Sequence, residues 1–320
     1  MLQKQKWAKS CLLMGAVAVA GLMPVAGFAQ DVIIDEEIQA INNGNISLSV
    51  SADVTNEYWF RGISQGLNTG VMVQPSVDIA FDLGSVAVGE EDIAFSGYVG
   101  TWNTFSSNGG AAGWYEADIY VGLSIDLPMN FTADVAFVAL EAPGAGGEFA
   151  QEIDLSFSYD DSQCWSDAGI EGMGFAGLQP YILFAFETAG GSDFGTDQGI
   201  YMELGIEPSF TIVENEDYPV TLAVPVAVGL SLSDYYETSN SAANAAAGIT
   251  SDETFGFVSV GLGLSVPLAF VPAEYGTWEA GAGLTFLILG DGLKDGSEFN
   301  AGTGDDSVRF IASAGVSMSY

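Results

Sequence analysis

Two long segments of alternating polarity constrain the fold more than any other feature of this sequence. Between Ile46 and Phe60 almost every second residue is apolar and the residues between them are mostly serine or acidic, and the same alternation recurs from Val71 to Leu83. This period predicts β-strands with two unlike faces. Both segments exceed the about five or six residues of an ordinary strand. Such strands favour a membrane barrel, with the apolar face toward lipid and the charged face toward a lumen.

The alternation recurs along the rest of the chain. Counting 46–61 and 71–83, we expect twelve strands; the other ten are 93–102, 115–126, 130–141, 149–159, 175–187, 200–207, 220–232, 254–271, 277–289 and 307–320. An even number lets both ends of a closed barrel lie in the periplasm, with the longer connections outside the cell. The sequence therefore predicts an all-β fold, a closed antiparallel transmembrane β-barrel of about twelve strands.

The amino terminus has the features of an export signal. Three lysines precede an apolar run, and small residues surround Ala29, which predicts a signal peptide over 1–29. Residues 30–44 are expected to be a periplasmic segment, either a short helix or plug or a disordered leader, and 45–320 the barrel. The chain ends in an alternating strand closed by Tyr320, which resembles the signal read by the barrel assembly machinery. We expect a cell outer membrane location, among lipid and lipopolysaccharide.

The first strand and loop also carry a family resemblance. The run Asn56-Glu57-Tyr58-Trp59-Phe60-Arg61-Gly62-Ile63-Ser64-Gln65, followed by Gln74-Pro75, resembles the amino-terminal signature of the Gcw_chp family, bacterial proteins labelled TorF family porins. The specific match covers about 20 residues of the chain. The resemblance implies an outer-membrane barrel and a pore, and it implies nothing about the cargo.

The charge balance limits the partners. Without the signal peptide, three basic residues, Arg61, Lys294 and Arg309, face 42 acidic ones. Nucleic acid is excluded as a partner, because phosphate binding depends on clustered lysine and arginine. Two interpretations of the acidity stay open. It serves solubility in a salty habitat, or it creates a field that gathers cations.

The alternation also predicts which side chains face the lumen. We expect the pore to be lined by Asp53, Glu57, Trp59, Arg61, Asp78, Asp82, Glu116, Asp118, Glu152, Asp154, Glu203, Glu207, Glu279 and Arg309. A barrel of twelve strands lies between the filled eight-stranded and the open sixteen-stranded barrels, so the lumen should be narrow. Acidic side chains in such a passage favour cations; the alternative is a lumen wall that is merely solvated.

Closure of the barrel predicts one charged cluster. The first and last strands must pair, and Glu57, Arg61 and Arg309 share the lumen face near the outer end of that seam. We expect either an ion-pair clasp that closes the barrel or a constriction that binds an anionic group of a solute. By the same parity Trp59 points inward, whereas Tyr58 and Phe60 should join the aromatic girdle on the lipid face.

The composition argues against an enzyme. The chain has no histidine, the residue whose pKa suits general base catalysis near neutral pH. A pair of carboxylates could catalyse glycoside hydrolysis, but among so many scattered acids any one pair is weak evidence for an enzyme. No Asp-x-Asp-x-Asp-Gly spacing marks a calcium site, so we expect neither cofactor nor metal. Cys164, the one cysteine after the signal, is expected in a turn without a chemical role.

These features lead to one functional expectation and two alternatives. The expectation is a narrow porin-like channel for passive passage of small solutes, with a preference for cations. The first alternative is a nonconducting structural or adhesive barrel with acidic surface loops. The second, a soluble secreted sandwich, would bury charged strand faces at a high cost.

Overall fold

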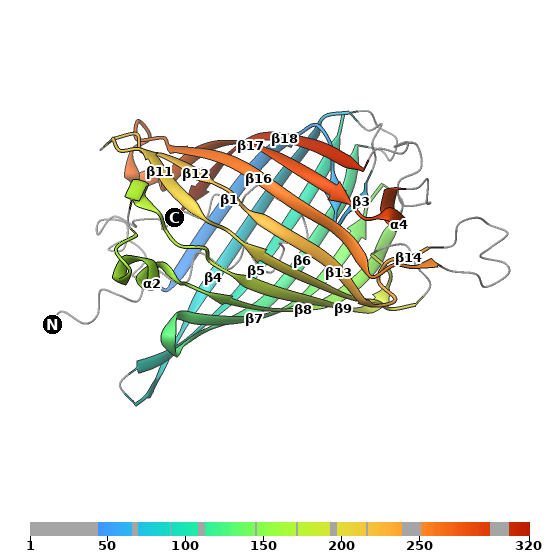
Figure 1. Cartoon of the computed structure of the whole chain (residues 1–320), viewed down its shortest axis with the longest axis horizontal. Coiled ribbons are helices and arrows are strands. Elements are labelled where there is room, and N and C mark those ends of the chain that lie inside the picture. Colours follow the sequence, from blue (N-terminus) through green and yellow to red (C-terminus); the bar gives the residue numbers. More distant parts are fainter. Residues whose placement is uncertain are drawn as a thin grey trace.

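The computed structural model describes residues 44–65, 70–89, 91–107, 113–144, 146–170, 172–192, 197–215, 217–238, 251–294 and 307–320. These residues form one closed antiparallel barrel (Figure 1). The expected signal peptide and almost all of segment 30–44 lie outside the described residues. The expectation of a transmembrane barrel of about twelve strands is confirmed.

Twelve wall strands follow one another around the barrel in the described part of the chain. They are β1 (Ile46–Thr55), β4 (Met72–Val88), β5 (Glu91–Ser106), β6 (Trp114–Leu127), β7 (Phe131–Ala142), β8 (Gly147–Tyr159), β9 (Tyr181–Gly190), β10 (Ile200–Ile206) with β11 (Ser209–Val213), β12 (Val220–Ala223) with β13 (Val226–Ser233), β16 (Phe255–Pro267), β17 (Thr277–Leu289) and β18 (Val308–Ser319). Each pairs antiparallel with its neighbours, and β1 closes the ring by pairing with both β4 and β18.

Two of these wall strands are interrupted by proline. Pro208 lies between β10 and β11, and Pro225 lies between β12 and β13. Proline cannot donate a ladder hydrogen bond. Both proline carbonyls still accept bonds from neighbouring backbone, Pro208 from Val224 N and Pro225 from Gly261 N, each at 2.8 Å. The wall therefore continues through both breaks.

The alternation in sequence becomes an alternation in exposure. On β6, Ile119 and Val121 are 56% and 54% exposed on the outside, while Asp118 and Tyr120 between them are 0% and 2% exposed on the inside. Only a membrane makes an apolar exterior around a polar interior stable, because lipid, and not water, then covers the apolar face. The barrel is therefore built to span a membrane.

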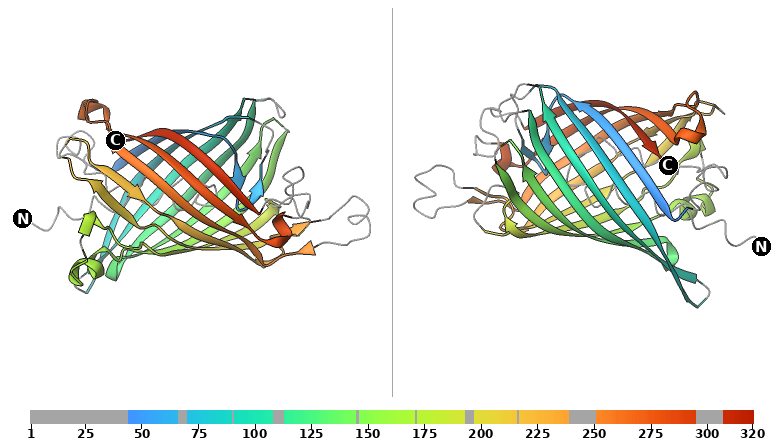
Figure 2. Two further views of the ribbon diagram at one scale, coloured as in Figure 1. Left: turned by 45° about the horizontal axis from the view of Figure 1, so that its top comes forward. Right: turned by 180° about the vertical axis from the view of Figure 1, so that it is seen from behind.

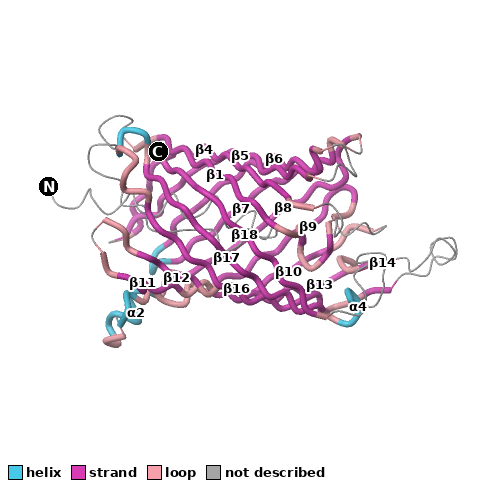
Figure 3. The backbone as a smooth tube through the Cα atoms, turned by 90° about the horizontal axis from the view of Figure 1, so that it is seen from above, coloured by secondary structure: helices cyan, strands magenta, loops and turns pink. Residues whose placement is uncertain are grey.

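The two ends of the barrel differ. The C-terminus lies at the same end as η2 (Pro128–Asn130), α2 (Ser162–Asp167), η3 (Gly172–Gly174) and η4 (Ala273–Tyr275), whereas α4 (Asp291–Lys294), β14 (Glu237–Thr238) and β15 (Ser251–Asp252) lie at the opposite end (Figures 1 and 3). We call these the periplasmic and extracellular ends, since most connections at the first are short and both chain ends of a bacterial barrel lie there.

One hairpin extends beyond the wall at the periplasmic end. The pairing of β1 with β4 stops at Phe81, and after Asp82 β4 pairs only with β5. The extension is visible in the right-hand view of Figure 2. The two strands of this hairpin were expected at 71–83 and 93–102, but strand pairing continues to Val88 and Glu91. Asp82 is exposed at the start of this extension and accepts a hydrogen bond from Gly84 N.

Candidate functional site

The most unusual feature of the interior is a hairpin that leaves the wall and folds into the lumen. Strand β1 ends at Thr55, and β2 (Trp59–Phe60) pairs with β3 (Ile63–Ser64) instead of with a wall strand. Gln65 N donates to Tyr58 O at 2.9 Å, which closes the base of the hairpin. We call residues 56–65 the lumen hairpin. The first strand predicted from the sequence, 46–61, is therefore too long by six residues.

Asn56 fixes the point where the chain turns inward. Its side chain accepts a hydrogen bond from Ala312 N at 2.7 Å and donates to Phe310 O at 3.1 Å, both on β18. Its backbone N donates to Ala312 O at 3.2 Å. The amide side chain replaces the backbone pairing that β1 would have made, so the strand ends without orphaned groups on β18.

The tip of the lumen hairpin is a two-residue turn that needs an unusual backbone. Arg61 and Gly62 have φ angles of 48° and 84°, the positive values that a two-residue hairpin turn matched to strand twist requires. Tyr236 Oη donates to Arg61 O at 2.8 Å. A Cβ on Gly62 would lie 2.9 Å from Phe257 Cδ1 and 3.0 Å from Leu293 Cδ1. Glycine here permits both the angle and the close packing.

The two faces of the lumen hairpin pack against opposite sides of the barrel. Trp59 and Ile63 contribute to a buried cluster whose other members are Leu183, Ala185, Tyr201, Tyr235, Tyr236, Phe257, Leu287, Leu289, Leu293 and Ile311. Tyr58 and Phe60 contribute to a second cluster, with Met72, Tyr98, Trp102, Tyr120, Ala136, Val138, Leu140 and Ala150. The lumen hairpin therefore crosses the lumen and contacts wall strands on both sides.

These clusters correct the expectation for two aromatic residues. Tyr58 and Phe60 were expected on the lipid face, but they are 2% and 3% exposed and lie inside the barrel. The alternation was extrapolated beyond Thr55, where the wall strand ends and the parity of the wall no longer applies. Trp59 is also inside, as expected, although it lies on the lumen hairpin.

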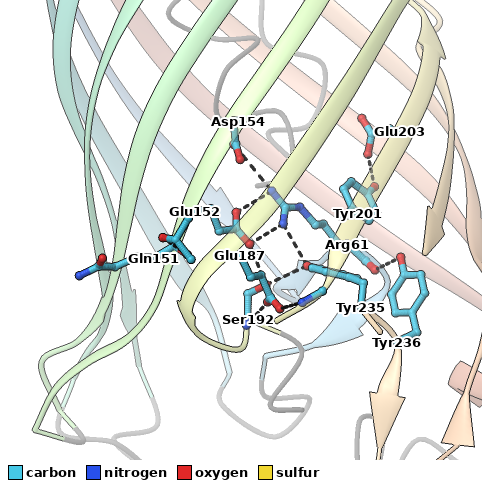
Figure 4. A network of polar contacts seen from close by, with 12 residues as sticks. Arg61, Gln151, Glu152, Asp154, Glu187, Ser192, Tyr201, Glu203, Tyr235 and Tyr236 are labelled. Atoms are coloured by element: carbon cyan, nitrogen blue, oxygen red, sulfur yellow. Dashed lines mark hydrogen bonds and ion pairs between the residues drawn. The ribbon is translucent and has the colours of Figure 1, made fainter. Parts of the chain in front are cut away.

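The Arg61 side chain extends from the hairpin tip to two acidic residues of strand β8. Its Nη1 and Nη2 donate to the two carboxylate oxygens of Glu152 at 2.7 and 2.9 Å, and Nη2 lies 3.8 Å from Asp154 Oδ2 (Figure 4). Nη1 also donates to Tyr235 Oη at 3.1 Å. The guanidinium is 2% exposed, and a buried charge is tolerated only with such paired contacts.

Three aromatic rings complete the surroundings of the guanidinium. Its Cζ lies 4.6 Å from the ring centres of both Phe60 and Tyr201, and 5.4 Å from that of Tyr235. All three distances are within the range in which a cation is attracted to an aromatic face. The site therefore combines a bidentate carboxylate with an aromatic enclosure, both of which favour a planar cation.

An extracellular loop is bound to the same carboxylate. Ser192 Oγ lies 2.8 Å from Glu152 Oε1, 2.7 Å from Glu187 Oε1 and 3.0 Å from Tyr235 Oη. Glu187 Oε2 accepts a bond from Gly199 N at 2.6 Å. Ser192, Glu187 and Tyr235 were not selected from the sequence, because no spacing linked them to β8. The tyrosine pair 235–236 before a strand was the only signal available.

The buried carboxyl groups near Arg61 outnumber its single guanidinium. Glu116 and Asp118 of β6 are 2% and 0% exposed, like Glu152 and Asp154 of β8. In the described part of the chain, both oxygens of Asp118 and one oxygen each of Glu116 and Asp154 are buried without a hydrogen-bond partner of standard geometry. Arg61 thus pairs with two of the four buried carboxyl groups on β6 and β8.

Other wall carboxylates bind tyrosines that lie flat on glycine. Tyr98 Oη donates to Asp134 at 2.6 Å, and Tyr120 Oη donates to Asp78. Tyr98 is registered opposite Gly122 and Tyr120 opposite Gly100, on strands β5 and β6. A side chain at either glycine would overlap the tyrosine ring. The rings are therefore held against the wall instead of projecting across the lumen.

The expected lumen residues fall into three groups. Glu116, Asp118, Glu152, Asp154, Glu203, Trp59 and Arg61 are buried inside the barrel. Asp53, Glu57, Asp78, Glu207, Glu279 and Arg309 are half-buried. Asp82 is exposed on the periplasmic extension.

The expected seam cluster is wrong. Arg61 binds Glu152 and Asp154 on β8, far around the wall from the seam of β1 and β18. Glu57 accepts a hydrogen bond from Trp59 Nε1 at 2.7 Å, and the Arg309 guanidinium lies 5.6 Å from the Trp59 ring centre. The tight turn at Arg61-Gly62 directs the arginine across the lumen, whereas a continuing β1 would have held it at the seam.

Two features are absent from the part of the chain that the structure describes. It contains no group of three or more acidic or cysteine side chains arranged to hold a metal ion. Among the same residues, no helix has the length and apolar character that a membrane crossing requires. Cys164 is exposed in α2 and lies 3.0 Å from Tyr159 Oη.

Structure comparison finds bacterial barrels with a similar fold, among them the following three. The NanC porin has 12% identity and a TM-score of 0.38, covering 85% of this chain and 98% of its own. The β domain of the Bordetella autotransporter BrkA has 11% identity and a TM-score of 0.40, covering 86% and 98%. Pseudomonas putida OprB has 8% identity and a TM-score of 0.38, covering 89% and 96%. These TM-scores are too low to place the chain beside any one of them.

Sequence comparison is more specific. No curated protein shows significant sequence similarity to this chain. The Gcw_chp family, described as "Bacterial protein of unknown function", matches residues 39–258, a range that contains the lumen hairpin and its β8 partners. Because this range is more than half of the chain, the protein belongs to the Gcw_chp family.

Proposed function

We propose that the protein is a narrow outer-membrane channel for the passive passage of small solutes, with a preference for cations. The observation that carries the proposal is the excess of carboxylates over guanidinium groups inside the barrel. The buried or half-buried lumen acids include Asp53, Glu57, Asp78, Glu116, Asp118, Asp134, Glu152, Asp154, Glu203, Glu207 and Glu279. Only Arg61 and Arg309 oppose them among the described residues, and such a wall attracts cations and repels anions.

The half-buried acids support a path from the periplasmic side. Asp53, Asp78 and Glu279 are all partly exposed although they are enclosed by the wall. Tyr120, which binds Asp78, lies flat on Gly100, so its ring stays against the wall. In this proposal the lumen hairpin forms the constriction. The first 29 residues are removed by signal peptidase during export through the inner membrane, before the barrel assembly machinery inserts the chain. The work of the protein is transport without chemistry, so the proposal includes no catalytic residue.

One observation favours a second function, that of a nonconducting structural barrel. The lumen hairpin packs against both sides of the wall, with Trp59 and Ile63 at most 1% exposed. A barrel filled in this way can serve as a scaffold for surface loops, which would bind lipopolysaccharide or another surface partner. The two functions differ in whether ions cross.

Planar-bilayer conductance of the refolded barrel across a salt gradient tests the proposal. We expect steady conductance with a cation-selective reversal potential that weakens when Asp78→Asn, Asp118→Asn and Asp154→Asn are combined. The matched control combines Asp160→Asn, Asp167→Asn and Asp217→Asn, which are exposed outside the strands, and it should keep the selectivity. Silence from a folded barrel would overturn the channel and favour the structural role.

A further inference from the structure

The contacts of Arg61 describe a binding site as well as an ion pair. A guanidinium is held by both oxygens of Glu152, by Tyr235 Oη and by three aromatic faces. Most of these groups belong to the wall and to the loops, since Glu152 lies on β8, Tyr201 on β10 and Tyr235 after β13. Arg61 itself arrives on a hairpin whose own main-chain pairing is limited to two residue pairs. The receptor groups are thus fixed, and the guanidinium is carried by a separate element.

The buried carboxyl groups around the site outnumber the single guanidinium of Arg61. Asp118 is fully buried, and both of its oxygens lack a hydrogen-bond partner of standard geometry in the described part of the chain. Asp154 and Glu116 each retain one such oxygen. A buried carboxylate without a partner is costly. A ligand with a second cationic group would find carboxyl groups here that Arg61 leaves without a hydrogen-bond partner.

We propose that this site binds small solutes that carry a guanidinium group and a second cationic group, and that Arg61 occupies it when the solute is absent. The inference rests on the proposed function and names the class of solute at the same constriction. A bound solute takes the place of the Arg61 guanidinium on Glu152. The lumen hairpin then loses its ion pair with β8, and the constriction is released.

Arg61 and the solute compete for the same groups. The apparent affinity of the wild-type barrel is therefore lowered by the fraction of molecules in which Arg61 fills the site. Removal of Arg61 should tighten solute binding, whereas a residue with a purely structural role would leave solute binding unchanged. The two roles therefore predict different effects of removing Arg61 on solute binding.

Isothermal titration calorimetry of the folded barrel in detergent, with agmatine as the probe, provides the test. Agmatine has a guanidinium at one end and a primary amine at the other. We expect Arg61→Ala to bind agmatine at least about tenfold more tightly than the wild type, because the internal competitor is gone. Glutamate, an anion, should bind to neither protein.

The second step locates the site on β8. Arg61→Ala with Glu152→Gln should lose the tightened binding, whereas Arg61→Ala with Glu148→Gln should keep it. Glu148 lies on the same strand but is exposed, so the control makes the same chemical change outside the site. Equal binding by the two double variants would overturn the inference, as would an Arg61→Ala barrel that binds agmatine no better than the wild type.

Folding yield provides a readout if Arg61→Ala folds only in part. The folded fraction, measured by gel mobility without heating, should rise with agmatine and stay unchanged in sodium chloride of equal ionic strength. A yield that is independent of agmatine would overturn the inference. Because calorimetry needs no conduction, a barrel that conducts but fails to bind agmatine overturns this inference alone, and a silent barrel that binds it overturns the channel alone.

Discussion

The wall and the lumen hairpin are stabilised in different ways. Each wall strand is paired with two neighbours over most of its length, and β1 alone has ten paired residues with β4 and seven with β18. The lumen hairpin has two paired residue positions, and its place depends on buried aromatic side chains and on Arg61. The wall is stabilised by many similar contacts, so no single one decides its stability. The position of the hairpin depends on fewer contacts.

This contrast indicates which part of the proposed channel can move. Opening any part of the wall would expose backbone groups to lipid, which costs several kcal/mol per group. Moving the lumen hairpin breaks one bidentate ion pair and a set of apolar contacts, but it opens no pairing between two wall strands. A gate is therefore expected on the hairpin and not on the wall.

The largest expected effect comes from Glu152→Gln, which removes the negative charge that pairs with Arg61 of the lumen hairpin. The substitution leaves Arg61 buried with its bidentate partner removed, and breaking a buried pair from one side costs about 3–5 kcal/mol. Denaturant titration of the folded barrel in detergent should report a loss of this size or a separate early transition of the lumen hairpin. Bilayer conductance should rise, since the hairpin is released.

Two variants sharpen this prediction. Glu148→Gln, on the same strand but exposed, should change the free energy of unfolding by less than about 0.5 kcal/mol. Glu152→Gln combined with Arg61→Gln should lose less than Glu152→Gln alone, because no unpaired charge remains. A single variant as stable as its control would contradict the role of the pair.

The wall was largely predictable from the sequence, because its contacts follow from the period of two. Tyr115 to Asp126 alternates without a break, and β6 runs from Trp114 to Leu127. The inward position of Asp118 and the outward position of Ile119 follow from the same pattern. Prolines disturbed the prediction only slightly, since Pro208 and Pro225 interrupt strands without ending them.

The lumen hairpin was not predictable in the same way. The apolar alternation continues through Tyr58 and Phe60, so periodicity alone cannot show that the wall ends at Thr55. The run Arg61-Gly62 between Phe60 and Ile63 contained the signal of a two-residue turn, yet Arg61 was assigned to the first strand and Gly62 to the connection that follows it. The partner of Arg61 lies 91 residues away on β8, and no local pattern points to a contact of that kind.

A charge on the outside of the wall tests the wall itself. Val77→Lys places an ammonium on the lipid face near the middle of the barrel part of β4, where Val77 is 38% exposed. A lysine on the lipid face near the bilayer midplane costs about 2–4 kcal/mol. Refolding into vesicles followed by denaturant titration should show this loss. Ser76→Lys, one residue away but facing the lumen beside Ser51, should cost less; an equal loss would contradict the assigned faces.

A smaller effect is expected from Gly62→Ala at the tip of the lumen hairpin. A non-glycine residue at positive φ costs about 1–3 kcal/mol in strain, and the added Cβ also meets Phe257 and Leu293. Gly84→Ala is the matched control, because Gly84 has φ +90° and no atom within 4 Å of a Cβ. The difference in unfolding free energy between the two variants measures the packing of the hairpin tip. Equal losses would mean that the hairpin tip is not packed as described.

The smallest expected effect lies in the periplasmic turn between β8 and β9, outside both wall and hairpin. Burial acts to raise the pKa of Asp160, but hydrogen bonds from Gln179 and Ser162 outweigh it and hold the pKa below the usual value of 3.8. A lowered pKa means that the stability which Asp160 contributes is present above pH 3.8 and is lost as the pH falls through the folded pKa.

Because Asp160 is exposed, Asp160→Asn should lower the free energy of unfolding at pH 7 by no more than about 0.5 kcal/mol. Denaturant titrations of the wild type and Asp160→Asn at pH 7 and at pH 2.5 give the comparison, with Asp167→Asn in α2 as the exposed control. The difference between the wild type and Asp160→Asn should shrink at the lower pH, where the wild-type carboxyl becomes protonated and no longer differs from the amide in charge. A difference that grows on acidification would reverse the sign of the pKa shift, and would show that the turn is held by the protonated carboxyl.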